Sequence, residues 1–160
     1  METINIQLMY PFISAVKSFS LFLVIAGLMF TAISCSDDDD EAPAVTDEFT
    51  TTLSGANENP PNDSNASGTA NLVYNRDTRI FEIVVEYTGI DAIGAHIHVG
   101  AEDVNGPVVF GFDPPDSPIN YTSEQLDAQQ ESDLYDGLYY VNIHSQAYPA
   151  GEIRGQLTQE

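Results

Sequence analysis

The sequence predicts an all-β domain of about seven short antiparallel strands with one short helix. Apolar and polar residues alternate along several short segments, which is the pattern of half-buried strands. Clusters of Gly, Pro, Asn and Asp separate these segments, as the turns between strands require. One segment alone, residues 122–137, has the spacing and the end signals of a helix.

The predicted strands cover most of the chain after residue 48. In chain order they are residues 49–55, 69–74, 79–89, 93–99, 106–112, 138–145 and 151–159. The segment 58–68 contains paired prolines and several Asn, Asp and Ser residues, so we expect a loop there. Short strands in this number favour an antiparallel β-sandwich with immunoglobulin-like topology, with a closed barrel as the alternative.

The clearest strand and the helix each carry a specific signal. The segment 79–89 has alternate apolar residues: Phe81, Ile83, Val85 and Tyr87. The helix is expected to begin with a capping box formed by Thr122 and Gln125 and to end at Gly137. Leu126 and Leu134 are then expected to face inward.

The charge balance and the cysteine count limit the function classes. The chain has 25 Asp and Glu residues against 4 Lys and Arg, a formal net charge of −21. This balance argues against nucleic-acid binding, because phosphates require a basic protein face. The single cysteine, Cys35, cannot form an intrachain disulfide.

Residues 1–34 have the layout of a secretory signal peptide. Lys17 is followed by an apolar run, Leu21–Phe30, and then by small residues. A transmembrane helix is the alternative, but this run is too short to cross about 30 Å of hydrocarbon. Met1 and Met9 are both candidates for the start of the segment.

The segment AISC, Ala32–Cys35, resembles the lipobox of bacterial lipoproteins, in which the cysteine becomes the lipidated first residue. We therefore expect acylated Cys35 to anchor the protein in the lipid bilayer of the outer membrane, a lone buried thiol being the alternative. Residues 35–48 form an acidic flexible tether, because five consecutive acids stay solvated. These acids also resemble the surface-export signal of some lipoproteins, which implies a surface-exposed domain; a periplasm-facing domain is the alternative.

Successive side chains of a strand point to opposite faces of the sheet, and this alternation (the parity of a residue) places all three histidines on one face of the predicted sheet. His96 and His98 alternate with apolar residues in one strand, and His144 does so in another. Imidazoles at positions i and i+2 of a strand can converge on one ion, and a third histidine completes a set that suits Cu or Zn. The alternative is that these residues hydrogen-bond one another and loop ends without a metal.

Three further polar residues share this parity: Asn142, Glu152 and Arg154. If the strands that carry them are neighbours, they join the histidines in one outward-facing polar cluster. Glu152 would then be a fourth ligand or would support the ligands through hydrogen bonds. Arg154 is expected to pair with Glu152 or with an Asp, because it is a lone cation near many carboxylates.

Several segments together resemble the CHRD domain, which is named after chordin and occurs in many bacterial secreted proteins. They are LSGANENPP, AHIHVG, NGPVV and GLYYVNIHSQAYPAGEIRGQL, in the expected order within Phe49–Leu157. The resemblance implies a CHRD-like domain at residues 49–160 with an immunoglobulin-like β-barrel or sandwich. It implies no settled biochemical activity.

The fold of that family has a remote similarity to copper–zinc superoxide dismutases. These enzymes bind copper through an H-x-H strand and a later histidine, and an arginine near the C-terminus guides the anion. The residues that resemble these in order are His96, His98, His144 and Arg154. The chain has no candidate for the bridging histidine or the additional zinc-site histidine, so the resemblance leaves only a mononuclear site. Dismutase activity does not follow, because an acidic surface repels superoxide.

Two functions from different classes follow. The first is a lipid-anchored, non-enzymatic binding or structural module for an unknown extracellular or periplasmic partner, since the sequence offers no Ser/His/Asp or Cys/His set. The second is a mononuclear copper or zinc protein that uses the three histidines. A third hypothesis is calcium binding by the loops 100–107 and 112–118, although neither has the ligand spacing of a known calcium loop.

Overall fold

The computed structural model of the protein describes residues 43–160. The predicted signal peptide, Cys35 and most of the predicted tether lie outside the described residues. In this part of the chain, no helix combines the length and the hydropathy needed to cross a membrane.

Nine strands, one α-helix and one short 3-10 helix make up the regular structure of residues 43–160. In chain order they are β1 (Thr46–Ser54), η1 (Gly55–Asn57), β2 (Ser67–Asn75), β3 (Ile80–Thr88), β4 (Ala92–Val99), β5 (Val108–Phe112), β6 (Ile119–Thr122), α1 (Ala128–Tyr135), β7 (Tyr139–Ser145), β8 (Ile153–Gln156) and β9 (Thr158–Gln159).

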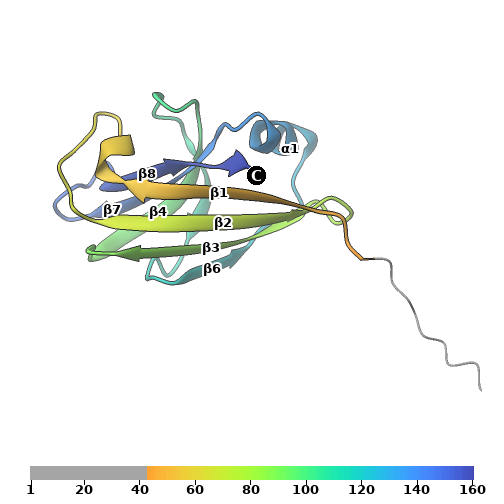
Figure 1. Ribbon diagram of the computed structural model, residues 1–160, viewed down its shortest axis with the longest axis horizontal. Helices are drawn as coiled ribbons and strands as arrows, with labels where there is room; N and C mark the ends of the chain where they lie inside the picture. Colours follow the sequence, from red (N-terminus) through yellow and green to blue (C-terminus); the bar gives the residue numbers. More distant parts are fainter. Residues whose placement is uncertain (1–42) are drawn as a thin grey trace, which may run out of the picture. The chain divides into compact units, whose positions relative to one another are not determined.

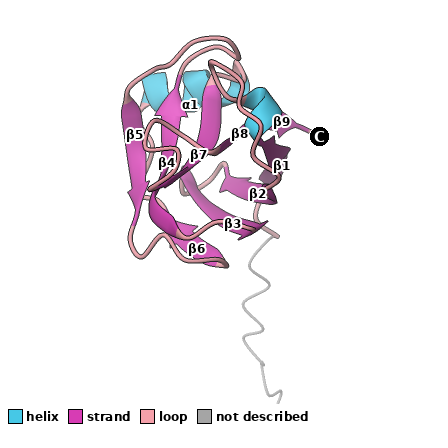
Figure 2. Ribbon diagram, turned by 90° about the vertical axis from the view of Figure 1, so that its left-hand side faces the viewer, coloured by secondary structure: helices cyan, strands magenta, loops and turns pink. Residues whose placement is uncertain are grey.

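The strands form one antiparallel sheet that curls into a nearly closed barrel. The strand order is β5-β4-β7-β8-β1-β2-β3-β6, with β9 paired to β1, and it can be followed around the ring in Figure 2. The two edge strands approach each other through Phe112 of β5 and Tyr121 of β6, whose ring centroids are 5.2 Å apart. The predicted fold class, all-β and antiparallel with one short helix, is confirmed.

Buried and exposed side chains alternate along strand β3, as the alternation of apolar and polar residues in its sequence predicted. Its inward side chains are all buried: Phe81, Ile83, Val85 and Tyr87. Its outward side chains, Glu82, Val84 and Glu86, are exposed. Burial of each aliphatic or Phe side chain stabilises the fold by about 1.5–3 kcal/mol, so the inward face holds β3 against the core.

The predicted capping box of Thr122 and Gln125 is wrong, because Thr122 lies in β6, which pairs with β3. Helix α1 instead starts at Ala128, and Asp127 and Gln130 form its capping box. Both residue pairs fit the same sequence pattern, and the pairing of β6 with β3 decides between them. Strand β6 was not predicted, because four residues between two turn-rich segments are too few to show a period.

Strand β1 begins at Thr46, three residues before the predicted start of the domain at Phe49. The carboxylate of Asp47 accepts hydrogen bonds from Arg76 and from the hydroxyl of Tyr135. Tyr135 of α1 also packs edge-on against Phe49, with ring centroids 5.7 Å apart. These contacts hold the start of β1 to α1, and both lie at the same end of the domain in Figure 1.

Strand β7 is buried on both of its faces. Its first five residues are each at most 3 % exposed: Tyr139, Tyr140, Val141, Asn142 and Ile143. Loops 58–66 and 100–107 cover the outward side, where they hydrogen-bond the side chains of β7. The two loops are joined at Asn59, which donates to the carbonyl of Asp103 at 2.6 Å and accepts from the amide of Asn105 at 2.7 Å.

Candidate metal centre

Strands β4, β7 and β8 are neighbours, as the predicted polar cluster requires. Their register places His96 opposite Asn142, and Asn142 opposite Arg154. His144 lies opposite Gly94 of β4. Adjacent strands therefore bring all three histidines to one side of the sheet.

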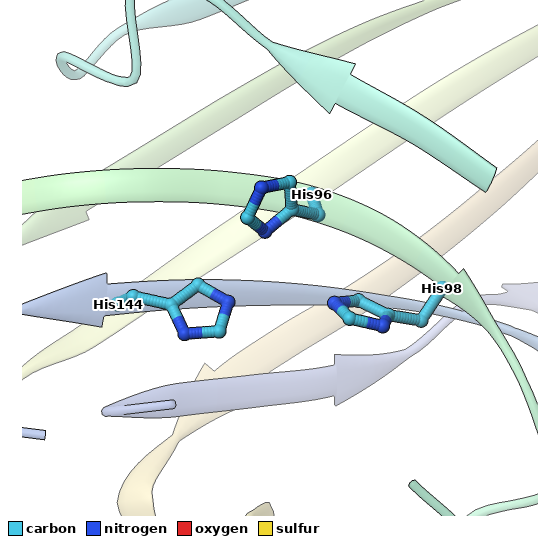
Figure 3. Close-up of side chains that lie close together, drawn as sticks. All are labelled: His96, His98 and His144. Carbon is cyan, nitrogen blue, oxygen red and sulfur yellow. The ribbon is translucent and has the colours of Figure 1, made fainter. Parts of the chain in front are cut away.

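The three imidazole rings face one another across a small space (Figure 3). One nitrogen from each ring lies within 4.8 Å of the others. The ring centroids are 5.0 Å apart for His96 and His144, 5.6 Å for His96 and His98, and 6.3 Å for His98 and His144. Within residues 43–160 no carboxylate joins this cluster, so the ligand set consists of imidazoles alone.

Backbone carbonyls orient two of the rings. Nδ1 of His98 lies 2.9 Å from the carbonyl oxygen of Gly106, and Nδ1 of His144 lies 3.1 Å from that of Pro149. A carbonyl only accepts, so each Nδ1 carries the proton and each Nε2 carries a lone pair. Nε2 of His98, Nε2 of His144 and Nδ1 of His96 are buried and have no hydrogen-bond partner in the described structure. Two of the three rings therefore already have the tautomer of a metal ligand, with Nδ1–H donated to a backbone carbonyl and Nε2 left with its lone pair.

Burial lowers the pKa of His96, His98 and His144 below the usual value. Neighbouring positive charge lowers each pKa further, from Arg154 for His98, from His144 and His98 for His96, and from His98 for His144. The imidazoles are thus neutral near pH 7, which is the form that binds a metal ion.

Tyr140 supports the ring of His98 from the neighbouring strand. The two rings are stacked, with centroids 4.9 Å apart and planes at 6°. The guanidinium carbon of Arg154 lies 3.4 Å from the centroid of the same tyrosine ring. Arg154, Tyr140 and His98 therefore form a contiguous stack of planar groups on the outer face of the sheet.

The predicted ion pair of Arg154 with Glu152 or an Asp is wrong. Its side chain has the expected outward parity and is 1 % exposed. It makes no ion pair within the described residues, and its guanidinium donates to the carbonyls of Ala101 and Val104 and to the amide oxygen of Asn105. Loop 100–107 folds over the outer face, so that its carbonyls replace the carboxylate that we expected to find there.

Two buried glutamates, Glu152 and Glu58, lie near the strands that carry the histidines, and they have different hydrogen-bond partners. Glu152 is 6 % exposed and accepts a hydrogen bond from Ser64 at 2.7 Å, away from the histidine cluster. It is not among the residues whose candidate ligand atoms cluster with those of the histidines in the described structure. Glu58, which parity could not reveal because it lies in a loop, accepts a 2.6 Å hydrogen bond from Asn142. Its only sequence signal was its place in the segment LSGANENPP.

The calcium hypothesis gains no support from loop 100–107. The carbonyl oxygens of Ala101 and Val104 accept hydrogen bonds from a buried guanidinium. Those oxygens face a fixed positive charge, which opposes the binding of a divalent cation at the same atoms.

Gly106 has no room for a side chain. A Cβ at this position would overlap the carbonyl oxygen of Val99, whereas a Cβ at Gly111 would meet only Cδ2 of His96 at 3.9 Å. We expect Gly106→Ala to lower the free energy of unfolding by about 1–3 kcal/mol, because the backbone must shift. Gly111→Ala, the matched control in the same region, should leave it unchanged or slightly higher. Urea denaturation checks both, and equal stabilities for the two variants would contradict the packing described here.

Burial raises the pKa of Glu58 to about 7 from its usual 4.5, against the opposing charge of Arg154. The folded state holds a proton that the unfolded chain releases, so the stabilisation is full below pH 4.5 and is lost as the pH rises through about 7. Glu58→Gln removes this titration and keeps an acceptor for Asn142. The free energy of unfolding of the variant minus that of the parent should therefore be on the order of 2–3 kcal/mol larger at about pH 8 than at about pH 5.

Urea denaturation at both pH values measures this gain. The exposed Glu86 provides the control, since Glu86→Gln removes a carboxylate that is not buried. A stability difference between Glu58→Gln and parent that is the same at both pH values would show that Glu58 does not titrate in this range.

One comparison with known proteins yields a match. The family model of the CHRD domain matches residues 49–157, which include the three histidines and Arg154. No curated protein and no solved structure matches the chain, so the remote similarity to the dismutases stays a prediction. The match covers more than half of the sequence, and the chain belongs to the CHRD domain family.

Proposed function

We propose that this CHRD domain binds one copper or zinc ion through His96, His98 and His144. One observation carries the proposal: the three rings offer one nitrogen each within 4.8 Å of one another, and each ring has one buried nitrogen without a hydrogen-bond partner in the described structure. Buried polar atoms are nearly always paired, and one bound cation would satisfy all three of these nitrogens at once. A CHRD domain is also consistent with a binding or structural module.

The chemistry of the donors favours particular metals. Three neutral imidazoles suit copper and zinc, whereas calcium and magnesium require oxygen ligands. Among divalent ions at a nitrogen site, affinity is highest for copper, so Cu²⁺ should bind more tightly than Zn²⁺. The absence of a carboxylate from the described cluster leaves a fourth position for water or an external ligand.

The surroundings of the site favour metal binding over dismutation. A dismutase needs positive potential that superoxide can approach. The guanidinium of Arg154 is 1 % exposed and its donors are taken by loop 100–107. The chain as a whole has a formal net charge of −21, which repels anions and attracts cations.

Elemental analysis by mass spectrometry tests the proposal. The sample is the compact unit Glu41–Glu160, made without an affinity tag and supplied with both ions. We expect about one copper or zinc ion per chain in the parent, and nearly none in the His96→Ala/His98→Ala variant. Thr69→Ala/Asn71→Ala, which changes an exposed i, i+2 pair on β2, should keep the metal.

A parent protein that contains neither copper nor zinc after this treatment would contradict the metal proposal. Equal metal content in the parent and the double histidine variant would place the metal elsewhere. In either case the histidines would be structural parts of the sheet, and the function of a binding module would remain.

We also propose that the domain is held at the outer membrane, facing the cell exterior, by lipid on Cys35. The lipobox-like segment and the acidic run that follows it support this placement. In a bacterial host, the full chain should incorporate radioactive palmitate and sediment with membranes, whereas Cys35→Ala should do neither. Ser36→Ala is the control and should behave as the parent. Palmitate incorporation by Cys35→Ala would refute the anchor, and protection from protease added to intact cells would place the domain in the periplasm.

A further inference from the structure

We propose that Arg154 is a positioning residue for the histidine site, and that it acts through loop 100–107 on the ring of His98. Its effect on metal affinity rests on the proposed function. Its effect on the imidazole of His98 exists without a metal and can be measured separately.

Arg154 holds the loop at three points. Its Nη2 donates to the carbonyl of Ala101 at 3.0 Å and to that of Val104 at 3.2 Å, and its Nη1 donates to Oδ1 of Asn105 at 3.2 Å. Hydrogen bonds from a charged group are stronger than neutral ones, and a buried group that loses them is not compensated by water. The guanidinium therefore fixes the path of the chain up to residue 105.

The next residue, Gly106, makes the contact with the site. Its carbonyl accepts the Nδ1–H of His98, and its own N–H donates to the hydroxyl of Tyr140 at 3.1 Å. Close packing against the carbonyl of Val99 leaves this residue little freedom to move. A fixed acceptor at Nδ1 keeps Nε2 of His98 unprotonated and directed to the other two histidines.

Arg154 reaches His98 by a second route through Tyr140. Its guanidinium lies over the ring of Tyr140, and that ring stacks on the imidazole of His98. The loop thus determines the tautomer of His98, and the stack determines the plane of its ring. Both supports lose a partner when Arg154 is removed.

His144 provides an internal control. Its Nδ1 lies against the carbonyl of Pro149, in a different turn from loop 100–107. None of the hydrogen bonds of Arg154 reaches that turn. A positioning role for Arg154 therefore predicts a change at His98 alone, whereas general loosening of the fold would affect both histidines.

The test compares Arg154→Met, Arg154→Lys and Arg79→Met with the parent. Arg79→Met removes an equal charge from the ion pair with Glu131, outside the site. Long-range proton–nitrogen spectra of the imidazoles in metal-free protein report the tautomer. In Arg154→Met we expect His98 to become a mixture of tautomers while His144 keeps its proton on Nδ1. Affinity for Cu²⁺ and Zn²⁺ should fall about 10- to 100-fold, with a smaller loss in Arg154→Lys and none in Arg79→Met.

Each outcome bears on one of the two proposals. Folded Arg154→Met with unchanged tautomers, or with equal changes at both histidines, overturns the positioning role. A parent that binds no metal overturns the proposed function, and the tautomer of His98 still decides the role of Arg154. If Arg154→Met does not fold, Asn59→Ala and Asn105→Ala release the same loop by removing weaker contacts. The spectra of those variants then decide the question by the same criteria.

Discussion

The outer face of this barrel depends on the burial of one cation. Arg154 is 1 % exposed, and an unpaired buried charge would cost several kcal/mol. Loop 100–107 supplies two carbonyls and an amide oxygen, and the ring of Tyr140 supplies its π-face. The loop can satisfy the guanidinium only by folding down onto β7 and β8. The same arrangement covers the outward face of β7 and places the carbonyl of Gly106 against Nδ1 of His98.

The histidine site is built by two different means. Strand register determines where the three rings lie, because β4 and β7 are paired over most of their length. Loop carbonyls determine how two of the rings are turned, since Gly106 and Pro149 hold the Nδ1 protons of His98 and His144. The ring of His96 has no such partner within the described residues. If the proposed ion binds, two of its ligands are already oriented and the third can adjust to it.

The electrostatic setting is unusual for a cation site. The chain is strongly acidic overall, yet the ligands are neutral imidazoles beside a buried cation. Glu58, which accepts a hydrogen bond from Asn142 of β7, has a pKa raised to about 7, so that it is only partly charged at neutral pH. The acidic charge attracts cations of every kind, whereas the proposed imidazole site would select those that prefer nitrogen ligands. In the proposed site, attraction and selectivity would therefore reside in different parts of the molecule.

The sequence by itself determined the all-β class and the common parity of the three histidines. Both follow from alternation between adjacent residues, and alternation is a local property of an extended chain. Only the tertiary structure decided that β4, β7 and β8 are neighbours, that helix α1 starts after β6, and that the polar face carrying Arg154 is buried. Glu58 reaches Asn142 from 84 residues away. The partners of a buried polar group depend on which loop folds over it, and no local pattern records that choice.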